Sequence, residues 1–170
     1  SDIAEMAGIS KASVFHYFGN KKNLYLFLYN MALDVIIGGI TNGMKETSHD
    51  FIERILRAQE LKLKVVAQYA GMYDFLYTTI NEDAAEIRTV MDEMNSGYKK
   101  AGFGTLLDGI DWSRFKPGVN AEMVINTVTW ISEGYIKQAI MHKKPLDIMT
   151  KEIYGYMDLI KQSMYKEEFL

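Results

Sequence analysis

Apolar residues recur at intervals of three and four along most of the chain. This spacing is typical of amphipathic α-helices, because positions three and four apart share one helix face. The chain has only two prolines that could interrupt helices, Pro117 and Pro145. The sequence therefore predicts an all-α fold. The expected helices are two short ones on either side of Gly8, one from Asn20 to about Lys45, one from Ser48 or Asp50 to about Tyr69, one at 71–80, one from Asn81 or Asp83 to about Gly102, and two at about 120–142 and 146–168.

The two short helices at the start carry clear local signals. Gly8 can end the first helix in a left-handed conformation, and Ser10 can cap the second. Apolar residues are spaced so that one face of each helix meets the other across the turn: Ile3, Ala7, Ile9, Val14 and Phe18. Because two short helices cannot enclose a core, we expect a third helix to cover their apolar faces.

The outward face of the second helix combines hydroxyls, a lysine and aromatic rings: Lys11, Ser13, Phe15, His16 and Tyr17. From Ile9 to Asn30 there are three lysines and no carboxylate. Lysines, hydroxyls and helix N-termini bind phosphate oxygens, and an aromatic ring can contact a thymine methyl group. This surface favours a nucleic acid, although Phe15 and Tyr17 could instead be core aromatics and His16 an ordinary surface histidine.

The same residues resemble a known family. Asp2 to Lys11, followed by Phe15-His16-Tyr17-Phe18 and by Asn20-Lys21-Lys22-Asn23-Leu24, is similar to the helix-turn-helix of TetR-type transcriptional regulators. The resemblance implies an incomplete DNA-binding lobe at 1–22, without its first helix, and a ligand-binding and dimerisation domain at 23–170. It also implies a cytoplasmic homodimeric repressor that a small molecule releases from a palindromic operator.

Matching positions to the family motif assigns roles to the lobe. Phosphate contacts fall to Ser1, Tyr17 and Lys21, and base-edge contacts to Lys11, Ala12, Ser13 and Phe15, while the role of His16 stays open. Ala12 stands where family members often carry glycine, so its methyl group changes the expected sequence preference.

The larger domain contains a candidate ligand pocket and a candidate dimer interface. An aromatic and methionine-rich wall suggests an apolar effector, although core packing explains the same residues: Tyr69, Tyr73, Tyr77, Met94, Tyr98 and Phe103. The helix at 120–142 is apolar around most of its circumference, which indicates burial on two sides. In the resembled family the last two helices form the dimer, and the alternative is an intrachain core.

Three glycines lie in the long helix: Gly38, Gly39 and Gly43. Each is about 1 kcal/mol less favourable than alanine in a helix interior. They either form a hinge that carries the ligand state to the DNA-binding lobe or let another helix pack closely, and the sequence leaves both open.

Composition narrows the remaining classes of function. The net charge of −3 is not that of a general nucleic-acid binder, but residues 1–30 hold three lysines against two acids, so DNA affinity must be local. There is no cysteine, the three histidines lie far apart, and Glu46-x-x-His49 is a single motif where di-iron sites need two. We therefore expect no enzyme, metal or cofactor, and no membrane span. The alternative to a regulator is an all-α ligand-binding or scaffold protein without DNA binding.

Overall fold

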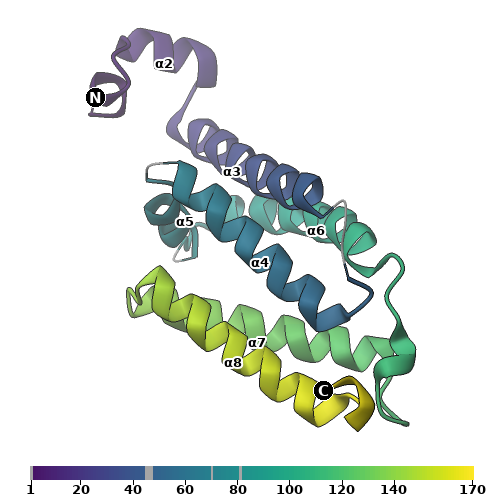
Figure 1. Cartoon of the computed structure of the whole chain (residues 1–170). Coiled ribbons are helices and arrows are strands. Elements are labelled where there is room, and N and C mark those ends of the chain that lie inside the picture. Colours follow the sequence, from purple (N-terminus) through teal and green to yellow (C-terminus); the bar gives the residue numbers. More distant parts are fainter. Residues whose placement is uncertain (1, 45–47, 70, 81) are drawn as a thin grey trace.

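The computed structural model describes residues 2–44, 48–69, 71–80 and 82–170. This part of the chain is built from α-helices and two short 3-10 helices, which confirms the all-α prediction (Figure 1). The elements are α1 (Asp2–Met6), α2 (Lys11–Phe18), α3 (Lys21–Gly43), α4 (Phe51–Gln68), α5 (Met72–Ile80), α6 (Ala85–Leu107), η1 (Trp112–Arg114), α7 (Ala121–Met141), α8 (Leu146–Met164) and η2 (Glu167–Phe169).

Helices α1 and α2 stand apart from the rest at the N-terminal end of α3 (Figure 1). Gly8 has a φ of 66°, which ends α1 as expected, and the Phe18 ring packs against Phe27 of α3. The expected apolar contact across the turn is largely absent, because Ile3, Ala7 and Ile9 are exposed. Helices of five and eight residues offer too little surface to bury one another.

Helix α3 connects the N-terminal lobe to the rest of the chain and packs against both α4 and α6. Its length and composition would allow it to cross a membrane, contrary to the expectation of no membrane span. One part of it is covered by this chain, since Leu24, Tyr29, Ala32 and Ile36 are buried, whereas Phe27 and Met31 are exposed. This weakens the case for a membrane span.

Two glycines of α3 lie where α4 comes closest. A Cβ on Gly39 would lie 2.3 Å from Val65 Cγ2, and a Cβ on Gly43 would lie 2.4 Å from Leu61 Cδ2. A Cβ on Gly38 would meet no atom within 4 Å. Close packing therefore accounts for Gly39 and Gly43, and Gly38 alone stays a hinge candidate.

This difference predicts opposite effects for two neighbouring substitutions. Gly39→Ala should lower the free energy of unfolding by about 1–3 kcal/mol, because β-branched Val65 has little freedom to move aside. Gly38→Ala should raise it by up to about 1 kcal/mol, since the methyl group enters open space and alanine favours the helix. Urea unfolding followed by circular dichroism measures both, and a stabilising Gly39→Ala would contradict the close contact.

Helices α4, α7 and α8 enclose the largest core of the described chain (Figure 1). Val124, Met157 and Tyr165 have no exposed surface. Two predicted boundaries are wrong. α6 continues past Gly102 to Leu107, because Leu106 and Leu107 pack on this core. α8 ends at Met164 instead of 168, because Tyr165 turns inward and forms an isolated bridge with Phe115.

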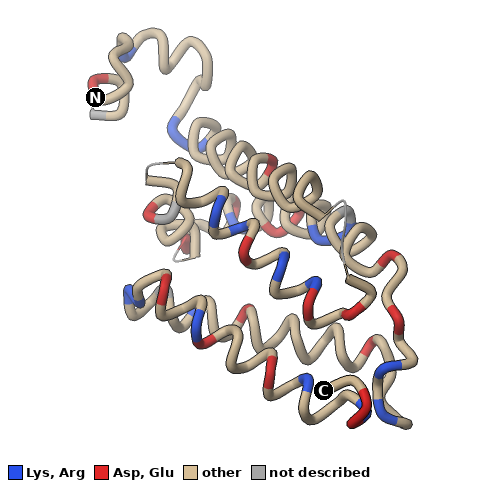
Figure 2. Tube along the Cα trace, in the orientation of Figure 1, with Lys and Arg blue, Asp and Glu red and all other residues tan. Residues whose placement is uncertain are grey.

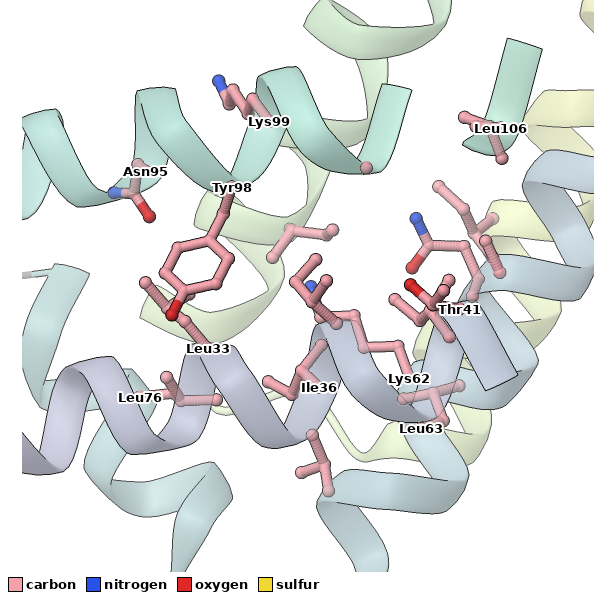
Figure 3. A pocket seen from close by; sticks show the side chains of 18 of the residues that line it. Leu33, Ile36, Thr41, Lys62, Leu63, Leu76, Asn95, Tyr98, Lys99 and Leu106 are labelled. Carbon is pink, nitrogen blue, oxygen red and sulfur yellow. The ribbon is translucent and has the colours of Figure 1, made fainter. Parts of the chain in front are cut away.

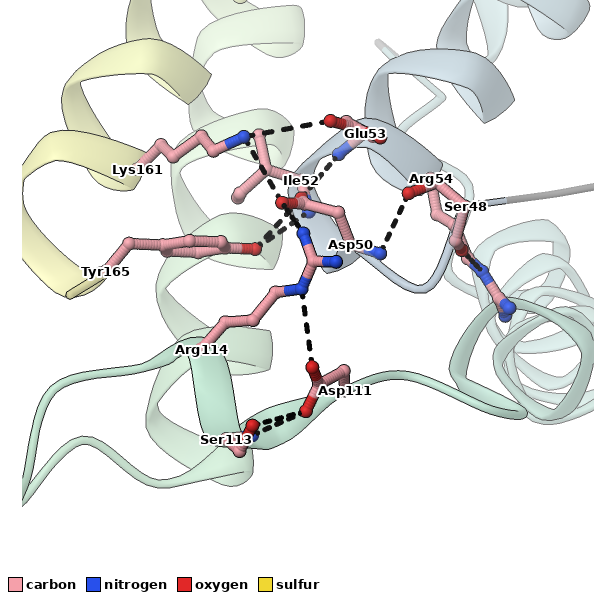
Figure 4. A network of polar contacts seen from close by, with 10 residues as sticks. All are labelled: Ser48, Asp50, Ile52, Glu53, Arg54, Asp111, Ser113, Arg114, Lys161 and Tyr165. Atoms are coloured by element: carbon pink, nitrogen blue, oxygen red, sulfur yellow. Dashed lines mark hydrogen bonds and ion pairs between the residues drawn. The ribbon is translucent and has the colours of Figure 1, made fainter. Parts of the chain in front are cut away.

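A buried carboxylate joins the start of α4 to the end of α8 (Figure 4). Asp50 is 0% exposed and caps α4 by accepting a hydrogen bond from Glu53 N at 3.1 Å. It also accepts one from the Tyr165 hydroxyl at 3.0 Å and lies 3.2 Å from both Arg114 Nη1 and Lys161 Nζ. Burial alone would raise the pKa of Asp50, but the Glu53 N–H, Lys161 and Tyr165 outweigh it and lower that pKa. Asp50 therefore stays ionised and holds three segments together.

Candidate nucleic-acid interface and internal cavity

Helix α2 presents its aromatic residues to solvent. Phe15 is 70% exposed and Tyr17 is 76% exposed, so neither is the core residue that the alternative interpretation required. The other candidates in the described chain lie on the same lobe: Lys11, Ala12, His16 and Lys21 are exposed and Ser13 is partly exposed. Ser1 lies outside the described residues. Large exposed rings on a lobe this small mark a surface made for contact.

Caps at both ends of α2 set the direction of these side chains. Ser10 Oγ accepts a hydrogen bond from Ser13 N at 3.0 Å, which begins α2 where the pattern predicted it. Gly19 ends the helix with a φ of 71°, and Asn20 caps α3 through Asn23 N at 2.8 Å. These turns bring Lys21 directly after the α2 face.

The lobe carries three lysines, all on α2 or at the start of α3, against two acids on α1, Asp2 and Glu5 (Figure 2). Lys22 pairs with Glu86 of α6 at 2.9 Å, which ties the start of α3 to the larger domain. Lys11 and Lys21 form no ion pair with any residue that the structure describes. Two exposed cations near a helix N-terminus that carries serine hydroxyls form a surface suited to phosphate oxygens.

The larger domain encloses a cavity of about 490 Å³ (Figure 3). Helices α3, α4 and α6 supply most of its wall, and α5, α7 and α8 contribute the rest. Its surface is mainly aliphatic, with Leu33, Ile36 and Leu63 among the lining residues. The volume lies within the usual range for small-molecule sites.

The polar groups of the cavity are few, and most are paired. The Tyr29 hydroxyl donates to Asn95 at 2.8 Å. The Tyr98 hydroxyl donates to the Asp34 carboxylate, and this hydrogen bond raises the pKa of Tyr98 to about 12. Lys62 reaches into the cavity from α4, and burial lowers the pKa of its amine.

Comparison with known proteins identifies the N-terminal lobe. A family model for bacterial regulatory proteins of the tetR family matches residues 1–27, which are α1, α2 and the start of α3. The N-terminal lobe is that of the tetR family. Proteins of this family are transcriptional regulators that bind DNA, usually as dimers, and they are generally not enzymes.

One curated relative extends the similarity beyond the lobe. The chain is 24% identical over 156 residues to the fatty acid metabolism regulator protein of Bacillus subtilis (strain 168). The matched region covers 88% of this chain and 77% of the relative. No solved structure matches.

The structure brings together only part of the predicted ligand wall. Tyr98 and Phe103 line the cavity, whereas Tyr69, Tyr77 and Met94 do not, and the side chain of Tyr73 is not described. Tyr69 is exposed at the end of α4, and Tyr77 packs against the Ala139 and Met149 cluster. Helix α5 lines the cavity through Leu76, Thr79 and Ile80 instead of its tyrosines, and the aliphatic face of α3 supplies a larger part of the wall.

Sequence reasoning missed Lys62, although a signal was present. Lys62 follows Ile55 by seven residues and precedes Val66 by four, so it occupies the buried stripe of α4. A lysine on such a stripe is a departure from the pattern.

Helices α7 and α8 also carry apolar side chains that this chain leaves uncovered. The residues are Met123, Trp130 and Met141 on α7, and Ile148, Tyr156 and Leu159 on α8. On α7 the three lie at intervals that return to one side of the helix, opposite the buried Val124 and Val128. Trp130 is 69% exposed and Leu159 is 64% exposed. The predicted two-sided apolar character of α7 therefore corresponds to one covered and one open face.

Proposed function

We propose that this tetR-family regulator is a repressor that binds a near-palindromic operator and leaves it when a small, mostly apolar ligand occupies the cavity. The exposed, cation-bearing face of α2 carries this proposal. Phe15 and Tyr17 stand in solvent beside Lys11 and Lys21, and no described acid pairs with either lysine. The binding free energy of such a face is most favourable when the partner is a phosphate backbone, because the phosphates supply the missing negative charge.

The roles of the individual residues follow from their places on α2. Residues near its N-terminus, Lys11, Ala12, Ser13 and Phe15, point toward base edges when such a helix lies in a major groove. Ser1, Tyr17 and Lys21 contact phosphates, and His16 flanks them.

A homodimer through α7 and α8 provides the two recognition helices that a palindromic operator requires. The uncovered apolar residues of these two helices would pack against the same residues of a second copy. Two recognition helices must then reach major grooves about 34 Å apart, which requires two matching half-sites.

The ligand acts by preferring one of two arrangements of α3. This helix lines the cavity and begins at Lys21, directly after the α2 face. A ligand changes DNA affinity only if it binds the two arrangements differently. The relative's printed role makes fatty acid metabolism a candidate for the process that this cytoplasmic regulator controls.

Substitutions in the lobe test the DNA-binding proposal. An operator selected from random DNA would be measured by fluorescence anisotropy at several salt concentrations. Lys21→Ala should weaken binding evenly on all sequences and reduce the salt slope by about one per subunit, because it removes a phosphate contact. Lys11→Ala and Ser13→Ala should instead change the preference among sequences. Lys100→Ala, an exposed lysine of α6, is the control and should change neither.

The alternative class, an all-α protein without DNA binding, predicts a different result in the same binding measurement. A chain that shows no DNA affinity at low salt would be a ligand-binding or scaffold protein. Equal losses on every sequence for all three variants would contradict the assignment of base-edge contacts.

A further inference from the structure

Lys62 is a cation inside an aliphatic cavity. It is half-buried, lies on the face of α4 that carries Ile55 and Val66, and lines the cavity together with residues such as Leu33, Ile36 and Leu63 (Figure 3). Its ammonium group forms no hydrogen bond or ion pair with any residue that the structure describes. Such an amine loses hydration without gaining a partner.

The other titratable groups of the cavity wall are already engaged. Tyr29 of α3 donates to Asn95, Tyr98 of α6 donates to Asp34, and Tyr135 of α7 donates to Glu152. Lys99 of α6 pairs with Glu133, and the described lining from α5 and α8 has no titratable side chain. No aspartate or glutamate is among the described lining residues. Lys62 is thus the cavity's one cation without a described partner, and no lining carboxylate competes for it.

Lys62 destabilises the folded protein when no ligand is bound in the cavity. Burial lowers the pKa of its amine, because the charged form loses water and finds no compensating charge. A methionine of similar length would fill the same stripe without this cost. The fold itself therefore gives no reason for a lysine here.

We propose that Lys62 binds the single anionic head group of an otherwise aliphatic effector, whose tail fills the cavity between α3, α4 and α6. This inference rests on the proposed function, since it names the chemical class of the ligand that releases DNA. The head forms an ion pair with the ammonium group, and that pair restores the charge that burial disfavours. A neutral or cationic head leaves the amine without a partner or repels it.

A series of ten-carbon ligands that differ only in the head group tests the assignment. Decanoate, decyl phosphate, decanol and decyltrimethylammonium would be titrated calorimetrically below their micelle concentrations. The wild-type protein should bind at least one of the two anions about tenfold or more tightly than decanol, and should bind the cation weakest. The anion with the higher affinity identifies the head as carboxylate or phosphate.

Two variants then assign the preference to one residue. Lys62→Met should lose the preference for anions while it keeps its affinity for decanol, and thermal unfolding should show it at least as stable as the wild type. Lys64→Met removes an exposed lysine of the same helix and should behave as the wild type. A wild-type protein that binds decanol as tightly as the anions, or a Lys62→Met variant that keeps the preference, would overturn the inference.

Operator binding without ligand separates this inference from the proposed function. Lys62→Met should bind the operator as the wild type does and should no longer release it when the preferred anion is added. A wild-type protein without DNA affinity contradicts the proposed function, whereas the head-group series still decides the role of Lys62.

Discussion

Asp50→Ala should lower the free energy of unfolding by about 3 kcal/mol, the low end for the loss of one member of a buried ion pair. The substitution removes the cap of α4, the acceptor for Tyr165, and the counter-charge of Arg114 and Lys161 at once. The loss is not larger because Arg114 and Lys161 keep some contact with water. Urea unfolding measures the change, and a loss below about 1 kcal/mol, the value of an ordinary cap, would contradict this account of the network.

Asp50→Asn is the matched control, because it keeps a capping oxygen and removes only the charge. The folded pKa of Asp50 is lower than the unfolded one, so its contribution to stability is present above the unfolded pKa and is lost as the pH falls through the folded pKa. The wild type should therefore exceed Asp50→Asn in stability at pH 7, and the difference should shrink below about pH 4. A difference that grows in acid would mean that the pKa shift has the opposite sign.

Leu159→Glu should convert the proposed dimer to a monomer and weaken operator binding by about a hundredfold or more, because two linked reading heads bind far more tightly than one. Leu159 is 64% exposed on the open face of α8, where a second copy would bury it. A buried glutamate without a partner is strongly unfavourable. Analytical ultracentrifugation gives the mass, and fluorescence anisotropy gives the affinity.

Lys100→Glu is the control for this substitution. It changes the charge of the chain by more, but Lys100 is exposed on α6, outside the proposed α7 and α8 interface. It should leave both the dimer and the affinity for DNA close to those of the wild type. A Leu159→Glu variant that stays dimeric would place the interface elsewhere on the chain.

Local chemistry explains which features could be predicted from the sequence. Ser10, Asn20 and Asp50 cap helices through their own side chains, so the starts of α2, α3 and α4 depend on residues next to them in the chain. The face of α2 could also be predicted, because a helix that short exposes most of its side chains.

Features that depend on distant partners could not be predicted in the same way. The end of α8 is decided by Tyr165, whose burial against Phe115 involves residues far apart in the sequence. The cavity wall depends on how α3 lies across α4, and the close contact of Gly39 with Val65 sets that approach. The tyrosines of α5 therefore looked like a pocket wall, although α5 lines the cavity through Leu76, Thr79 and Ile80 and the aliphatic face of α3 supplies a larger part.

The central claim is that the outward face of α2 enters a groove of operator DNA, and photo-crosslinking tests it most directly. Benzoylphenylalanine would replace Phe15 in one variant and Trp130, which is equally exposed on α7, in another. The account predicts that position 15 crosslinks to operator bases upon irradiation, while position 130 crosslinks only to a second protein chain. A variant that binds the operator but forms no crosslink to DNA from position 15 would contradict it.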